Sequence, residues 1–207
     1  MATIITPQIA IVILAAGASS RMGIPKQLLK WGEDSLLNHA IKTAIDSKAS
    51  EVIVVLGANH ELIQKEIHDH AVTILKNTDW KHGLGNSIAC AVKHILDAKP
   101  KTEGVLITLA DQPLIDSDYL NDIIQNFTPK ENQIIATAYD LGKNGVPVLF
   151  DKTYFEALSK LSNDYGAKRL LEAYESLVKT LKPPLKNVDL DSKEDYEKLH
   201  NANFKIK

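Results

Sequence analysis

The sequence predicts an α/β protein in which a mostly parallel sheet is covered by helices on both faces, giving a three-layer α/β/α arrangement. Short apolar runs alternate with segments of helical periodicity along the chain. The first apolar run lies near the N-terminus and leads into a loop of small residues, as a buried parallel strand would. No long linker or low-complexity tract divides the 207 residues, so we expect a single domain over 1–207.

The expected strands are runs of apolar and β-branched residues. They occupy residues 10–14, 51–56, 72–75, 104–109, 134–138 and 146–150. Two further strand candidates lie late in the chain, at 177–181 and 187–190, and Pro183 and Pro184 break the chain between them.

Helical periodicity fills the segments between these strands. The expected helices span 36–47, 61–70, 86–98, 117–127, 152–161 and 166–176. Ser35 is the expected N-cap of the first of them. A last helix is expected to begin at Ser192, because Ser192 and Asp195 have the spacing of a capping box.

Composition limits the classes of protein that the chain can belong to. Hydrophobic residues make up 44% and charged residues 24%, with a formal net charge of −2, so no overall field attracts nucleic acid or an acidic membrane. The lone cysteine excludes an internal disulfide, and no apolar stretch approaches the roughly 18 residues of a membrane span. The first residues lack the basic region of a signal peptide. We expect a cytoplasmic protein without nucleic-acid or membrane partners.

The most informative segment is the apolar run that begins at Ile11 and the loop that follows it. The loop contains Gly17, Ser19 and Ser20, and the cations Arg21 and Lys26 follow it closely. Open α/β sheets bind ligands at the carboxyl ends of their strands, where glycine allows close approach and fixed cations neutralise phosphate charge. The sequence therefore predicts a polyphosphate site.

Two common phosphate loops do not fit this segment. A Walker A loop needs two glycines five residues apart followed by Lys-Ser/Thr, whereas Gly17 and Gly23 are six apart and Lys26 follows Ile-Pro. A dinucleotide fingerprint needs a second glycine two residues after the first, and Ser19 stands there.

Asp111 is the strongest candidate metal ligand. It follows the apolar run 105–110, at the carboxyl end of an expected central strand. A bound polyphosphate needs its negative charge neutralised, and Mg²⁺ prefers one or two carboxylates together with phosphate oxygens and water. We expect Mg²⁺, with Mn²⁺ as an alternative, and a second carboxylate beside Asp111.

These motifs together resemble a known family, the MobA-like nucleotidyltransferases. The motifs, in the order of that family, are LAAGASSRMG at 14–23 followed by Lys26, GLGNS at 83–87, LADQP at 109–113, GVPVLF at 145–150, NDYGAK at 163–168 and DLDSKED at 189–195. The double alanine after Leu14 is similar to the molybdopterin cytidylyltransferase branch, since the guanylyltransferase branch usually has Leu-Ala-Gly-Gly. The resemblance implies a Rossmann-like nucleotidyltransferase (GT-A-like) fold.

The resemblance also implies a reaction and its partners. A nucleoside monophosphate would pass from an NTP, CTP by the double alanine, to a phosphorylated acceptor such as molybdopterin, and pyrophosphate would leave. The N-terminal half would bind the NTP and the C-terminal half the acceptor. A molybdoenzyme or a cofactor chaperone would then be a protein partner. Val146 stands where many relatives have histidine, which leaves the identity of the acceptor open.

Residue roles follow from the matching motif positions. The resemblance makes three residues catalytic: Arg21, Lys26 and Asp111. The nucleotide-binding positions are Leu14, Ala15, Ala16, Gly17, Ser19, Arg21, Lys26, Gly85, Asn86 and Ser87. The acceptor-binding positions are Gly145, Pro147, Asp164, Lys168 and Arg169. The metal positions are Asp111 together with Asp189 or Asp191, between which alternation along an extended segment does not choose.

Two other classes of function stay open at this stage. One is an NAD(P)H-dependent oxidoreductase, since a relative of the family is described as reducing a pigment, although the dinucleotide fingerprint is missing. The other is a carrier that delivers a cofactor without catalysis, against which the joint presence of Arg21, Lys26 and Asp111 argues. A nucleotidyltransferase with another phosphorylated acceptor is the alternative within the leading class.

Overall fold

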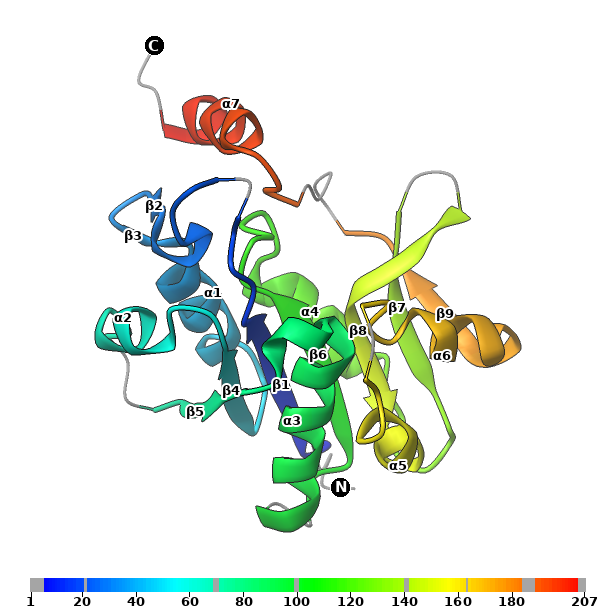
Figure 1. The fold of residues 1–207 in the computed structure, drawn as a ribbon. Helices are drawn as coiled ribbons and strands as arrows, with labels where there is room; N and C mark the ends of the chain where they lie inside the picture. The colour runs from blue at the N-terminus through cyan, green and yellow to red at the C-terminus, as the bar shows by residue number, and fades with distance from the viewer. Residues whose placement is uncertain are drawn as a thin grey trace.

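The structure, a computed structural model, describes residues 6–20, 22–68, 71–98, 101–139, 142–162, 164–183 and 189–204. Its centre is a seven-stranded sheet of order β5-β4-β1-β6-β8-β7-β9 (Figure 1). The strands are β1 (Ile9–Ala15), β4 (Glu51–Leu56), β5 (Thr73–Lys76), β6 (Gly104–Leu109), β7 (Ile134–Ala138), β8 (Asn144–Asp151) and β9 (Val178–Leu181).

The sheet is mostly parallel, as the sequence predicted. Strand β1 pairs in parallel with β4 and β6, β4 with β5, and β7 with β9. Strand β8 alone among these runs antiparallel to both of its neighbours, β6 and β7. The reversed strand β8 lies between the parallel strands β5, β4, β1 and β6 on one side and β7 and β9 on the other.

Helices cover both faces of the sheet. One face carries α1 (Leu36–Ile45), α2 (His60–Lys65) and α4 (Ser117–Gln125), and the other carries α3 (Leu84–Ala98), α5 (Phe155–Leu158) and α6 (Lys168–Ala173). Successive residues of β1 point to opposite faces, so Ile11 and Ile13 enter one core while Val12 and Leu14 enter the other. The predicted three layers are confirmed.

Several predicted boundaries differ from the observed ones. The helix expected over 152–161 is a 3-10 turn, η4 (Lys152–Tyr154), followed by α5. Further 3-10 turns are η1 (Lys26–Leu28), η2 (Trp80–His82) and η5 (Glu175–Leu177). The strand expected over 187–190 is wrong at Asp189 and Leu190, which lie in an irregular segment; residues 187 and 188 lie outside the described residues.

Two small elements close one end of the molecule. A hairpin of β2 (Lys30–Trp31) and β3 (Asp34–Ser35) packs with α7 (Lys193–Phe204), and Figure 1 shows them side by side at the end where the chain finishes. Trp31, Leu36 and Leu190 are buried together between them. The hairpin was not predicted, because strands of two residues are too short to show a period.

The two predicted helix caps are confirmed. The amide of Asn38 donates to Ser35 Oγ at 3.2 Å, which caps α1. Before α7, the amide of Asp195 donates to Ser192 Oγ at 3.1 Å, and the amide of Ser192 donates to the Asp195 carboxylate at 3.0 Å. Within the described ranges, every helix is too short or too polar to cross a bilayer.

Candidate active site

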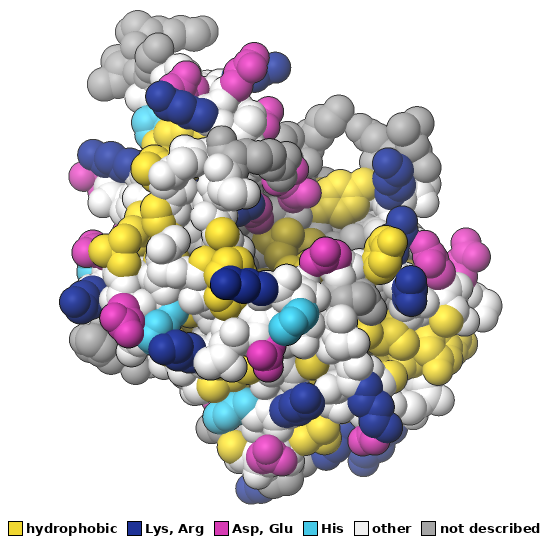
Figure 2. Space-filling view, in the orientation of Figure 1, with side chains coloured by type: hydrophobic (Ala, Val, Ile, Leu, Met, Phe, Trp, Pro, Cys, Tyr) yellow, Lys and Arg dark blue, Asp and Glu magenta, His cyan; other side chains and the backbone are white. Residues whose placement is uncertain are grey.

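A pocket of about 400 Å³ lies at the carboxyl ends of the central strands β1 and β6. Figure 2 shows the molecule hollowed on this face below α7, with hydrophobic side chains visible inside the hollow and acidic side chains beside it. Its lining residues are Leu14, Ala15, Ala16, Gly17, Lys26, Gln27, Trp80, Lys81, Gly83, Leu84, Ser87, Leu109, Ala110, Asp111 and Asp164. The pocket is therefore where a parallel sheet places its ligand.

The loop after β1 is tied down by one buried side chain. Gln27 is 2% exposed, and its Nε2 donates to the carbonyls of Ala15 at 2.8 Å and Gly17 at 3.0 Å. The carbonyl of Ala16 accepts from the amide of Ala58 at 3.0 Å. Since buried carbonyls left without donors would be costly, these contacts fix the course of the loop along the pocket.

Ser19 shapes the loop from outside the pocket. Its backbone is left-handed, with φ of 53°, and its hydroxyl accepts from the amide of Lys26 at 3.0 Å. Apart from Gly17 and its two chain neighbours, no atom of the described residues lies within 4 Å of the place where a Cβ on Gly17 would stand, which leaves room for a ligand there. Arg21 lies outside the described residues, so its predicted phosphate contact stays a prediction.

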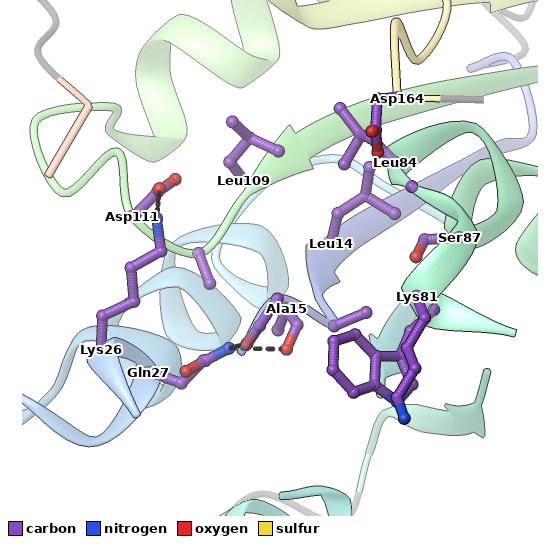
Figure 3. Close-up of a pocket in the computed structure, with 15 residues that line it drawn as sticks. Leu14, Ala15, Lys26, Gln27, Lys81, Leu84, Ser87, Leu109, Asp111 and Asp164 are labelled. Atoms are coloured by element: carbon purple, nitrogen blue, oxygen red, sulfur yellow. Dashed lines mark hydrogen bonds and ion pairs between the residues drawn. The ribbon is translucent and has the colours of Figure 1, made fainter. Parts of the chain in front are cut away.

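One end of the pocket is charged. Lys26 Nζ forms an ion pair with Asp111 Oδ2, as Figure 3 shows, and lies 4.0 Å from Asp191 Oδ1. Asp111 is only 7% exposed and directly follows the strand β6 and Ala110. The amide of Leu190 donates to the backbone carbonyl of Asp111 at 3.2 Å, which fastens the acidic segment before α7 to this strand end.

Gln112 links the same end to the acidic segment. Its Nε2 donates to Asp189 Oδ1 at 2.7 Å and to the Tyr139 hydroxyl at 3.2 Å, while its buried Oε1 has no partner in the part of the chain that the structure describes. Desolvation by the surrounding protein raises the pKa of the Asp189 carboxyl above its usual range, and the charges of Asp111 and Asp191 raise it further. Asp189 as a whole residue is nevertheless exposed to solvent.

The three predicted metal residues thus converge on Lys26 and Gln112. Among the described residues, no group of three or more His, Cys, Asp or Glu side chains is arranged as a ready metal site. Asp111 and Asp191 face the same lysine, and Asp189 is electrostatically coupled to both. The three carboxylates lie close together in the structure, and their role as metal ligands stays a prediction.

The other end of the pocket, called the neutral end below, is lined mostly by uncharged side chains, with Lys81 and Asp164 as its charged residues among those the structure describes. Figure 3 shows Ser87 and Lys81 on the side of the pocket away from Lys26 and Asp111. A Cβ on Gly57 would lie 2.6 Å from Trp80 Cβ and 2.7 Å from the Ala16 carbonyl oxygen, so only glycine lets the indole-bearing turn approach this closely. Apolar side chains, Leu14 and Leu84 among them, complete this end.

The GLGNS segment contributes to the pocket only in part. Ser87 lines it, whereas Gly85 and Asn86 are not among the described lining residues; Asn86 Nδ2 instead donates to the His82 carbonyl at 3.1 Å. Gly83, with φ of 104°, lies so close to Asp164 that a Cβ would stand 2.1 Å from its Oδ1. Asp164, predicted for the acceptor, therefore lies against the segment that was predicted to bind the nucleotide.

The other predicted acceptor residues lie elsewhere. Gly145 and Pro147 are in β8, where the peptide bond before Pro147 is cis and Thr137 Oγ1 donates to the Pro147 carbonyl at 2.7 Å. On α6, Lys168 Nζ lies 3.7 Å from Glu172 Oε1, and the Arg169 guanidinium lies 4.9 Å from the Tyr165 ring centroid. In the described structure none of these predicted residues lines the pocket. Sequence reasoning missed two of the lining residues entirely, Gln27 and Lys81.

The fold and the pocket define a nucleotide-binding α/β protein of the nucleotidyltransferase type. Residues 11–178 match the family model of the MobA-like NTP transferase domain, and the chain belongs to that family. The family resemblance predicted from the motifs is therefore confirmed, and the chain is a nucleotidyltransferase of this fold.

Curated relatives with different activities match the chain. The purine catabolism protein PucB of Bacillus subtilis is 29% identical over 95% of this chain and 98% of its own length. The nicotine blue oxidoreductase of Paenarthrobacter nicotinovorans is 30% identical over 81% of this chain and 83% of its own. The molybdenum cofactor cytidylyltransferase of Escherichia coli is 34% identical over 54% of this chain and 56% of its own.

A solved structure agrees with the fold over nearly the whole chain. Rv0371c of Mycobacterium tuberculosis superposes with a TM-score of 0.82 at 26% identity, covering 96% of this chain and all of its own. Rv0371c has also been crystallised as a complex with manganese, at a TM-score of 0.78 and 25% identity over 94% of this chain and 99% of that one. This likeness confirms the fold class and does not identify the substrates.

Proposed function

We propose that this protein is a divalent-metal-dependent cytidylyltransferase that transfers CMP from CTP to a phosphorylated acceptor of the molybdopterin type. The observation that carries the proposal is the ion pair of Lys26 and Asp111 at one end of a pocket whose other end is lined mostly by uncharged side chains. A cation and a buried carboxylate beside a glycine loop suit a metal-bound triphosphate, and a neutral end suits a base.

The triphosphate would lie along the loop after β1. The open face of Gly17 permits close approach of a phosphate, and Lys26 supplies a point charge beside it. Arg21, in the same loop by sequence, would add a guanidinium fork for two phosphate oxygens. Leu14, Ala15 and Ala16 would contact the nucleoside where they line the pocket.

Asp111 would hold the metal together with Asp189 or Asp191. The donor set fits, because all three are carboxylates, the ligands that Mg²⁺ and Mn²⁺ prefer, and Asp189 is destabilised as an anion by the other two. When bound, the metal would supply neutralisation of charge on the phosphates. The manganese complex of Rv0371c supports a divalent cation in this family.

The chain's own residues would then position the reactants. An oxygen of the acceptor's phosphate would attack the α-phosphorus, a new P–O bond would form, and the bond to the bridging oxygen would break so that pyrophosphate leaves. Lys26 would stabilise charge developing on the phosphates, and no protein nucleophile is needed. The acceptor would approach from the side of Asp164 and β8, with Gly145, Pro147, Lys168 and Arg169 as its predicted contacts.

The choice of CTP and of a molybdopterin-type acceptor rests on likeness. The double alanine at 15–16 and the 34% identity with the molybdenum cofactor cytidylyltransferase support both. A protein partner that receives the product, a molybdoenzyme or a chaperone for it, would follow from that acceptor.

Pyrophosphate release tests the proposal. Molybdopterin as acceptor, Mg²⁺ and each of the four NTPs in turn should give release with CTP alone. Pyrophosphate release with a different NTP would support nucleotidyl transfer but contradict the choice of CTP. Tight NTP binding without release would contradict the choice of acceptor and direct the search to other phosphorylated acceptors.

A second candidate function comes from one specific observation, the match to nicotine blue oxidoreductase over 81% of this chain. An oxidoreductase would oxidise NADH or NADPH in the presence of a quinonoid dye and would not release pyrophosphate. Both nicotinamide cofactors should therefore be followed at 340 nm with the same protein preparation. Oxidation that survives Asp111→Asn would favour this function over nucleotidyl transfer.

A further inference from the structure

A pair of buried polar residues lies at the neutral end of the pocket; Ser87 is a predicted nucleotide-binding residue, and Asn77 is not. Asn77 follows β5 and is 5% exposed, and Ser87 in the first turns of α3 is 2% exposed. Asn77 Nδ2 and Ser87 Oγ lie 3.0 Å apart. Ser87 lines the pocket and Asn77 lies behind it.

The direction of this hydrogen bond is fixed by a third contact. The backbone amide of Asp79 donates to Asn77 Oδ1 at 2.9 Å. A backbone N–H can only donate, so the amide oxygen of Asn77 must face Asp79 and its NH₂ group must face Ser87. Ser87 Oγ is therefore the acceptor in its contact with Asn77.

The Ser87 hydroxyl must then direct its own hydrogen elsewhere. A hydroxyl has one hydrogen to donate, and among the residues that the structure describes Ser87 has no acceptor for it. A desolvated donor without a partner is costly, and the space that Ser87 lines is the pocket. The donor is thus available to a ligand in the pocket.

We propose that Asn77 is a positioning residue that directs the Ser87 hydroxyl hydrogen into the pocket, so that the site selects an NTP whose base presents a hydrogen-bond acceptor there. The inference rests on the proposed function, because it takes the pocket to hold an NTP with its triphosphate at Lys26 and Asp111. Cytosine presents two such acceptors, O2 and N3, beside its amino donor.

The pair offers a variant that reverses the polarity without changing the shape. In Asn77→Asp, one carboxylate oxygen still accepts from the Asp79 amide, and the other can only accept from Ser87. The Ser87 hydrogen would turn toward residue 77, and only lone pairs would face the pocket. Loss of a matched hydrogen bond and creation of two opposed acceptors should weaken binding of the preferred base selectively.

The test is calorimetric binding of each of the four Mg-NTPs at pH 8, where the new carboxylate is ionised. We expect Ser87→Ala and Asn77→Asp each to lower the affinity for the preferred NTP about tenfold, and the others much less, so that selectivity collapses. Because Asn77 acts through Ser87, the double variant should bind like Ser87→Ala alone. Asn126→Asp, the same change at an exposed helix end, should leave all affinities unchanged.

Each remaining outcome decides the matter. Equal losses for all four NTPs, or additive losses in the double variant, would overturn the role of Asn77 while the proposed function stands. Absence of NTP binding by the unaltered protein would overturn both. If thermal unfolding shows that Asn77→Asp does not fold, Asn77→Ala replaces it: a freely rotating Ser87 hydroxyl should still reduce selectivity, and unchanged selectivity would contradict the proposal.

Discussion

The two ends of the pocket are built in different ways. At the charged end, Lys26, Asp111 and Asp191 come from three distant segments, and each polar group already contacts another. At the neutral end, Ser87 presents a buried hydroxyl that is held from behind by Asn77. The first arrangement suits groups that neutralise and position phosphates, and the second suits a contact that discriminates. Changes at the charged end should therefore alter rate, and changes at the neutral end should alter choice of base.

The largest expected effect is that of Asp111→Asn. The change keeps the shape of a residue at the end of β6 and removes the charge that pairs with Lys26. We expect kcat for pyrophosphate release to fall by about 10²–10³-fold, without a change in which NTP is preferred.

The matched control for that variant is Asp118→Asn, an exposed acid in the first turn of α4. It should keep both rate and melting temperature. Near-normal kcat for Asp111→Asn across a magnesium titration would show that the charged end has been misidentified.

Lys26→Met should come next in size. Removing the cation leaves the carboxylates of Asp111 and Asp191 without their shared partner and removes a phosphate contact. We expect kcat/KM for the NTP to fall about 10²-fold. Lys81→Met, at the neutral end above the Trp80 ring, should have a far smaller effect. Equal effects of the two substitutions would contradict the claim that the charged end governs the rate.

A smaller effect is expected for Gln112→Leu, which keeps the size of the side chain but removes the donor to Asp189. Partners that orient metal ligands usually contribute about 10–100-fold to metal affinity. The Mg²⁺ concentration for half-maximal rate should rise about tenfold at unchanged kcat under saturating metal. An unaltered magnesium dependence would show that Asp189 does not hold the metal.

Gln27→Ala tests the loop that joins the two ends. Its amide donates to the carbonyls of Ala15 and Gly17, so the truncation removes the donor of the buried Ala15 carbonyl. We expect the free energy of unfolding to fall by about 1–3 kcal/mol in urea titrations. Gln64→Ala on the exposed face of α2 serves as the control and should change it by less than about 0.5 kcal/mol.

The smallest effect concerns pH. Burial lowers the pKa of His39, whose Nε2 lies 3.0 Å from the carbonyl of Pro113 in the loop after Asp111. The folded state therefore favours the neutral imidazole more than the unfolded chain does, in which the pKa of this histidine is near 6.5. The resulting stabilisation of the folded state is complete above about pH 6.5 and is lost as the pH falls below that value.

We expect a loss of at most about 1.4 kcal/mol for each pH unit between the folded and unfolded pKa values of His39. Between pH 8 and pH 5, the free energy of unfolding should change less with pH for His39→Gln than for the unaltered protein. An identical pH dependence of the free energy of unfolding in the two proteins would show that His39 is not its cause.

Sequence reasoning succeeded where a local pattern has one physical meaning. The apolar run 10–14 predicted a buried strand, the position of Asp111 predicted a place at the carboxyl end of a central strand, and Ser35 predicted a helix start. Strand ends, caps and glycine loops are encoded within a few residues, so a single sequence is enough to locate them.

It failed where the partner is distant or the element is short. Gln27 is one amide in a turn, and nothing nearby shows that its donors meet the carbonyls of Ala15 and Gly17. The reversal of β8 depends on pairing with strands on both sides. Asp164 lies against Gly83 because two loops far apart in sequence meet, which no local pattern could show.

The packing of the hairpin against α7 has a practical consequence for spectroscopy. The chain has two tryptophans: Trp31 is buried with its ring centroid 5.0 Å from that of Phe204, and Trp80 lines the pocket. Their indoles therefore sit in separate environments, one under the last helix and the other in the ligand space. In Trp31→Phe the remaining fluorescence reports on the pocket alone, and in Trp80→Phe it reports on the attachment of α7. The protein thus contains two independent optical probes without any added label.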